Sequence, residues 1–141
     1  MKTLFQLFLS ILFASSVLAK RAAPVEVAPV TVGNVVISVP HFCQVDGVAV
    51  RGGVLEARDS ATGKLVWSMR VYKIPYDPAL EGDVQDVFIK TLSHDATHGL
   101  LLLSDESDRV FVVDLKSRKV TPVARGEAPE KIKKDAGAKR E

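Results

Sequence analysis

The chain has 141 residues, of which 47% are hydrophobic, 6% aromatic and 26% charged, and its formal net charge is +2. This length and apolar fraction fit one ordinary domain, and with a single cysteine they exclude a disordered chain, a collagen-like repeat and a disulfide-stapled miniprotein. The near-neutral charge does not suggest a nucleic-acid-binding protein, because such proteins usually carry a strongly basic face or domain.

Residues 1–19 have the pattern of a secretory signal peptide. Lys2 precedes an apolar run from Leu4 to Leu18, and Val17 and Ala19 supply small residues at the cleavage positions. The run is shorter than the ~18 residues or more that a membrane-spanning helix needs. We therefore expect cleavage after Ala19, a periplasmic or secreted protein, and no stable membrane span in the mature chain. An uncleaved membrane anchor is the alternative.

The two flanks of the mature chain differ from its middle. Residues 20–33 contain Pro24 and Pro29, which disfavour a helix, so this segment is predicted to be an extended linker or an edge strand outside the core. Residues 124–141 are rich in Lys, Glu, Ala and Gly and are predicted to form a charged flexible tail. The core is therefore expected within residues 34–123.

Residues 34–123 predict an all-β domain. Short apolar runs recur between clusters of Gly, Asp, Ser and Thr, and no long stretch shows a sustained helical period. We expect an antiparallel meander of about seven to eight short strands that forms a small sandwich or partly open barrel. The expected strands cover residues 34–39, 44–50, 55–58, 65–72, 84–92, 100–103, 109–115 and 119–123.

The clearest predicted hairpin joins residues 55–58 to 65–72 through a turn at 59–64. In its second strand Leu65, Trp67 and Met69 alternate with more polar residues, which predicts one face toward the core. Gly63 can supply the positive φ angle that such a turn needs.

The segment from Ala57 to Trp67 resembles the repeat of quinoprotein-type β-propellers, whose blades end in Ala-x-Asp-x-x-Thr-Gly-Lys-x-x-Trp. The residues Asp59, Thr62, Gly63 and Trp67 occupy the corresponding positions. The resemblance implies structural roles for them: the aspartate and threonine close the turn, the glycine allows it, and the tryptophan packs between neighbouring sheets. It implies propeller-blade-like hairpins and no catalytic role.

A weaker copy of the same pattern follows at Asp114, with Arg118 in the place of Gly63. Residues 34–123 suffice for two blades, whereas propellers close with about four to eight. A complete monomeric propeller is therefore excluded and no cofactor is expected, although a two-blade unit that assembles into a larger ring stays an alternative. The stretch from Trp67 to Ile89 also resembles small exported bacterial proteins of unassigned activity.

Four side chains are candidate metal ligands. His41 and Cys43 would project from one face of a strand, and His94 and His98 bracket a turn. Nitrogen and thiolate donors suit zinc or copper, but polar loop residues are the alternative reading. As the only cysteine, Cys43 is expected to be buried beside Phe42, with an intermolecular disulfide as the alternative.

The loop at residues 75–86 is the candidate partner-binding region. It holds four carboxylates but lacks the residue order of a calcium loop. Two tyrosines flank Pro75 and are expected to be exposed, which favours contact with a protein or saccharide. The candidate binding residues are Tyr72, Tyr76, Asp77, Glu81 and Asp83.

The functional expectation is an exported noncatalytic β-domain that acts as an interaction or accessory module of the bacterial envelope. Its partner would be an unknown protein or envelope component, and self-association is left open. The sequence has no nucleophile elbow, phosphate-binding loop or dinucleotide fingerprint, so no enzyme is expected. A small periplasmic protein that binds zinc or copper is the alternative function.

Overall fold

The structure is a computed structural model and describes residues 21–127. Within this range ten strands and one short helix confirm the predicted all-β class, with two or three more strands than expected. The expected signal peptide and residues 128–141 of the expected tail lie outside the described residues. The elements are β1 (Val30–Val32), β2 (Val35–Ser38), β3 (Phe42–Val45), β4 (Val48–Arg51), β5 (Val54–Asp59), β6 (Leu65–Arg70), α1 (Gly82–Gln85), β7 (Ile89–Asp95), β8 (Leu100–Asp105), β9 (Val110–Asp114) and β10 (Val120–Val123).

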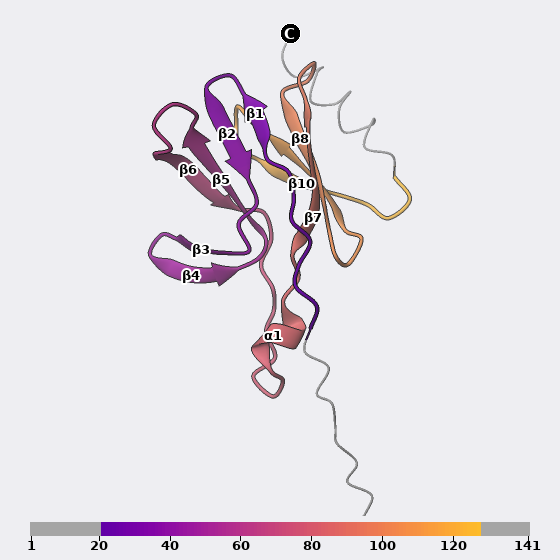
Figure 1. Cartoon of the computed structure of the whole chain (residues 1–141). Coiled ribbons are helices and arrows are strands. Elements are labelled where there is room, and N and C mark those ends of the chain that lie inside the picture. Colours follow the sequence, from indigo (N-terminus) through magenta and orange to yellow (C-terminus); the bar gives the residue numbers. More distant parts are fainter. Residues whose placement is uncertain (1–20, 128–141) are drawn as a thin grey trace, which may run out of the picture.

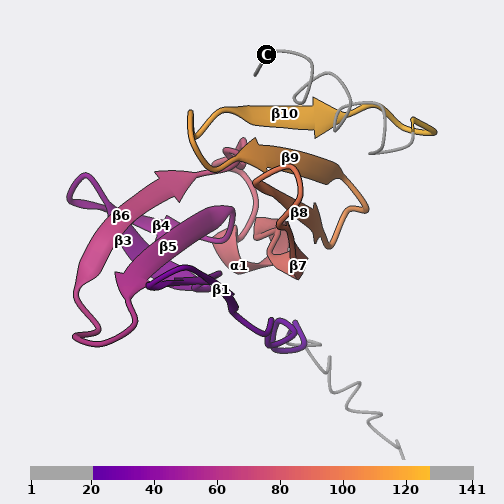
Figure 2. The same ribbon diagram turned by 90° about the horizontal axis from the view of Figure 1, so that it is seen from above.

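The strands form two four-stranded antiparallel sheets and one separate hairpin. The first sheet has the order β1-β2-β5-β6, and the second has the order β7-β8-β9-β10 (Figures 1 and 2). The hairpin of β3 and β4 is inserted between β2 and β5, which pair directly with each other. Apart from this insertion both sheets are meanders, and they close into neither a barrel nor a ring within residues 21–127.

The core lies between the two sheets, as predicted for a sandwich. Alternate residues of each strand point to one face, and those inner faces are apolar on both sheets. Trp67 and Met69 are half-buried against this core as the alternation predicts, whereas Leu65 at the start of the strand is exposed. The buried cluster comprises Ile37, Leu55, Ala57, Val71, Tyr72, Ile89, Leu101, Leu103, Phe111 and Val113.

The turn between β5 and β6 has the geometry expected for it. The Oδ1 atom of Asp59 accepts hydrogen bonds from the backbone N–H of Thr62 at 2.7 Å and from its hydroxyl at 2.8 Å. Gly63, at φ +69°, donates its N–H to the carbonyl of Asp59. These three residues therefore close the turn.

The same turn recurs between β9 and β10, at the weaker copy of the pattern. There Oδ1 of Asp114 accepts from the N–H of Ser117 at 2.8 Å, and Arg118 takes the glycine-like φ of +55°. The turn expected between His94 and His98 is of the same kind, because Oδ1 of Asp95 accepts from the N–H of His98 at 3.2 Å. An aspartate at the start is thus the shared feature, and the residue with positive φ can vary. The resemblance to the propeller family itself stays a prediction.

Three segments differ from the expected strands. Residues 44–50 are not one strand, because Asp46 and Gly47, both at positive φ, reverse the chain and make the hairpin of β3 and β4. The strand expected at 84–92 begins only at Ile89, after the helix α1. Val30–Val32 forms β1 at the edge of the first sheet, and Val30 and Val32 contact the core rather than lying outside it.

No helix within residues 21–127 combines the length and hydropathy needed to cross a bilayer.

Candidate binding cleft

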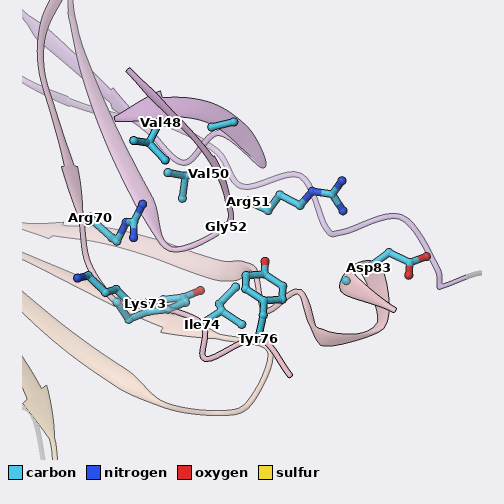
Figure 3. A pocket seen from close by; sticks show the side chains of 12 residues that line it. Val48, Val50, Arg51, Gly52, Arg70, Lys73, Ile74, Tyr76 and Asp83 are labelled. Atoms are coloured by element: carbon cyan, nitrogen blue, oxygen red, sulfur yellow. The ribbon is translucent and has the colours of Figure 1, made fainter. Parts of the chain in front are cut away.

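A cleft of about 700 Å³ lies between β4 and the loop that joins β6 to β7 (Figure 3). This volume falls in the range of pockets that hold ligands, roughly 300–1,000 Å³. We call it the binding cleft. It is lined by Val48, Ala49, Val50, Arg51, Gly52, Arg70, Tyr72, Lys73, Ile74, Tyr76, Gly82 and Asp83.

Two glycines between β4 and β5 set the position of the hairpin. Gly52 and Gly53 have φ of +63° and +66°, and a Cβ on Gly53 would lie 2.8 Å from the ring of Tyr72. The carbonyl of Gly53 accepts a hydrogen bond from the N–H of Val71 at 2.7 Å. The backbone of this junction therefore packs directly on the loop, which brings β4 to the edge of the binding cleft.

Tyr72 is buried, and the expectation that it would be exposed is wrong. Its ring stacks on Phe111 with 5.2 Å between centroids, and its hydroxyl donates to the carbonyl of Val87 at 2.9 Å. Burial raises the pKa of Tyr72 well above its ordinary value. Tyr72 therefore contributes a fixed wall of the binding cleft rather than a mobile contact residue.

Tyr76 is 45% exposed, as expected, and it is tied to the protein by its hydroxyl. That hydroxyl donates to Oδ1 of Asp86 at 2.5 Å, and Asp86 in turn lies 3.5 Å from the guanidinium of Arg51 on β4. The guanidinium of Arg21 donates to the main-chain carbonyl of Asp86. Desolvation and the hydrogen bond to Asp86 raise the pKa of Tyr76 to about 12. This network fixes the loop against the hairpin.

The side chain of Gln85 closes the loop on itself. Its Oε1 accepts from the N–H of Asp77 at 2.6 Å, and its Nε2 donates to the carbonyls of Asp77, Leu80 and Glu81. Of the predicted carboxylate contacts, only Asp83 lines the binding cleft; Asp77 and Glu81 do not. The prediction thus located the loop but not the side of it that faces the cavity.

The binding cleft has an excess of positive charge. Three basic side chains line it, those of Arg51, Arg70 and Lys73, against the single carboxylate of Asp83. Arg51 is paired with Asp86, but neither Arg70 nor Lys73 forms an ion pair within the described part of the chain. Two cations are therefore available to a ligand.

Exposed apolar side chains are concentrated on the two elements that frame the binding cleft. Five of the eight exposed large apolar residues of the described chain belong to the hairpin or to the loop. Figure 3 shows Val48 and Tyr76 on opposite sides of the cavity. The five are Phe42, Val48, Tyr76, Leu80 and Val84, each at least 45% exposed.

None of the three histidines lines the binding cleft. The ring of His41 packs edge-on against Phe88 at 5.2 Å, and Nδ1 of His98 lies 3.1 Å from Oδ2 of Asp95. His94 lies on β7 and is half-buried. Within residues 21–127 no group of three or more His, Cys, Asp or Glu side chains is arranged to hold a metal ion, so the four predicted ligands are not brought together.

Cys43 is half-buried rather than buried, and Phe42 beside it is exposed on the other face of β3. Burial raises the pKa of its thiol, the carboxylate of Glu56 adds to the rise, and the guanidinium of Arg70 opposes it. Since the thiolate is the nucleophile and the metal ligand, the neutral thiol favoured here is weakly reactive.

The basic residues of the binding cleft were missed from the sequence. An Asp-Gly pair between short apolar runs, at Asp46 and Gly47, is a signal for a hairpin and could have identified β4 as an edge. The approach of Arg70 and Lys73 to that edge depends on the tertiary fold and has no local signal.

No family model matches the chain, and no curated protein matches it either. The functional interpretation therefore rests on the geometry of the binding cleft.

Proposed function

We propose that the protein is an exported, noncatalytic β-domain that acts as an interaction module of the bacterial envelope and binds a partner protein at the binding cleft. The observation that carries the proposal is the concentration of exposed apolar side chains on the two elements that frame a formed cavity. Exposed apolar residues with a polar surround are typical of interaction sites. The proposal of export rests on the signal-peptide pattern of residues 1–19.

The chemistry of the lining supports binding rather than catalysis. Valine, isoleucine and tyrosine offer apolar contact, and arginine and lysine offer charge and hydrogen bonds. The one hydroxyl that a ligand could reach, that of Tyr76, already donates to Asp86. Both walls are held by main-chain and side-chain hydrogen bonds, so the cavity exists before a partner arrives, which lowers the entropic cost of binding.

The position of the hairpin in the fold also supports this role. β2 pairs directly with β5, so the first sheet does not need the hairpin to complete its ladder. At the corresponding place in the second sheet, β8 and β9 are joined by a short turn at residues 106–109. An insertion that a sheet can omit is a common place for binding residues.

Site-specific photo-cross-linking in the exporting cell tests the proposal. A photoreactive residue at Val48 or Tyr76 should give one and the same cross-linked partner. The matched control is Leu65, which is similarly exposed but begins β6, whereas Arg70, which lines the binding cleft, ends it. The same products from Leu65, or no product from either cleft position, would contradict a partner site in the binding cleft.

A further inference from the structure

The binding cleft runs along the edge of β4. Side chains of successive strand residues point to opposite faces, so a cavity over one face touches only every second residue. All four residues of β4 and the following Gly52 line this cavity. β4 pairs with β3 alone, and β3 is the strand of the hairpin that contacts β6. The cavity therefore borders the edge of β4 that no strand of residues 21–127 covers.

That edge carries unpaired main-chain groups. The N–H of Gly52 donates to the carbonyl of His41 at 2.9 Å, which places it on the side of β3. The amide groups of an antiparallel strand point alternately to its two sides. Ala49 and Arg51, each an odd number of residues from Gly52, therefore direct their N–H and C=O groups away from β3. No described residue forms a main-chain hydrogen bond with them on that side.

The groups beside this edge are complementary to an acidic segment. Arg70 and Lys73 have no carboxylate partner within residues 21–127, and both line the cavity next to β4. Val48 and Ile74 line the same cavity and supply apolar contacts near the two cations (Figure 3). In an extended segment that alternates carboxylates with apolar residues, the carboxylates can meet the two cations and the apolar side chains can meet Val48 and Ile74.

We propose that the partner of this module presents an extended acidic segment that adds to the open edge of β4 as a third strand. The inference rests on the proposed function and specifies its partner. Main-chain hydrogen bonds to Ala49 and Arg51 hold the segment, and its carboxylates meet Arg70 and Lys73. The open edge favours a peptide over an anionic lipid or sugar, since neither of these supplies a ladder of amides.

A synthetic peptide of about eight residues that alternates Glu with Val is a suitable probe, because this length covers β4 with a margin at each end. Calorimetry with the purified full chain should detect binding of this peptide and weaker binding of the peptide with Lys in place of Glu. The double substitution Arg70→Gln and Lys73→Gln should weaken binding of the acidic peptide by about tenfold or more. The matched control Lys64→Gln, in the turn outside the binding cleft, should leave it unchanged. Failure of the acidic peptide to bind, or equal binding of both peptides, overturns the proposal.

Two measurements identify strand addition itself. In hydrogen-exchange measurements, the bound peptide should slow the exchange of the backbone amides of Ala49 and Arg51. The exchange rate of the Gly52 amide, which already donates to His41, should change little. Two peptides can be made with alternate amides N-methylated, one with the odd-numbered and one with the even-numbered amides blocked. Only one of the two should lose binding, because an added strand uses the amides of one of its edges. Binding without protection of Ala49 and Arg51, or equal effects of both methylated peptides, overturns strand addition but leaves the proposed function standing. The absence of a cross-linked partner at both Val48 and Tyr76 would instead contradict the proposed function.

Discussion

Replacement of Gly52 by alanine should destabilise the protein more than an ordinary glycine substitution. Gly52 has φ +63°, and a left-handed backbone costs an L-residue roughly 1–2 kcal/mol. In addition, a Cβ at this position would meet the carbonyl oxygen of Val87 inside van der Waals contact and would lie 3.2 Å from Cδ1 of Phe88. A main-chain atom cannot rotate away, so overpacking adds about 1–3 kcal/mol. The expected loss of unfolding free energy is about 2–5 kcal/mol.

Gly63→Ala is the matched control. Gly63 has a similar φ of +69°, but a Cβ there would have no atom within 4 Å. Its replacement should therefore cost only the backbone penalty, roughly 1–2 kcal/mol. The difference between the two variants isolates the close approach of the β4–β5 junction to the backbone of Val87.

Urea and thermal unfolding of both variants measure this difference. For a domain of this size, 1 kcal/mol corresponds to a shift of about 4–8 °C in Tm, so the two variants are distinguishable. Equal losses for Gly52→Ala and Gly63→Ala would refute the argument that close packing of this junction sets the position of the hairpin. In that case the wall of the binding cleft would be free to move away from the loop.

Two further predictions concern the turns and the tyrosines. Arg118 lies at φ +55° with its guanidinium 4.7 Å from the ring centroid of Trp67, and both Arg118→Ala and Arg118→Gly lose this contact of ~0.5–1 kcal/mol. Only glycine also relieves the left-handed strain, so in urea unfolding Arg118→Gly should be the more stable by about 1 kcal/mol, and equal stability would argue against strain at this turn. The pKa values of both tyrosines are raised above 10.0, that of Tyr76 to about 12, so the folded state holds these protons more tightly than the unfolded state. The stability that these raised pKa values contribute is complete below pH 10 and is lost as the pH rises toward 12 and beyond. The ultraviolet absorbance of tyrosinate should therefore rise near pH 10 in the unfolded protein but not in the folded protein. Ionisation of Tyr72 or Tyr76 near pH 10 in the folded chain would contradict the raised pKa values.

The predictable parts of the fold are those with local causes. The turn at Asp59 could be predicted because its hydrogen bonds join residues within three positions of one another. The inward-facing residues of β6 could be predicted because the alternation of side chains is a property of the strand itself. The division between β3 and β4 was missed because the apolar residues around Asp46 continue the pattern of one strand. The helix α1 was missed because the side-chain bonds of Gln85 that stabilise its loop leave no periodic pattern.

The predictable part of the candidate site is smaller. Composition located the loop and the exposure of Tyr76, since proline and carboxylates favour a solvated segment. Composition could not reveal that Tyr72 is buried, because the ring that covers it, that of Phe111, comes from the second sheet. Composition also could not predict that Arg70 lies near β4, since that proximity depends on the backbone conformation at Gly52 and on packing across the fold.

The two sheets provide a comparison within the same chain. Both are four-stranded meanders with an aspartate turn between the last two strands, yet only the first contains the inserted hairpin. The hairpin is attached to the start of the second sheet through Phe88, whose ring contacts those of His41 and Phe42 at 5.2 and 6.0 Å. These ring contacts do not use the main-chain groups of Ala49 or Arg51, and the side chain of Arg51 adds its ion pair with Asp86. Substitutions along the open edge of β4 can change what the binding cleft binds while the two sheets that support it keep their pairing.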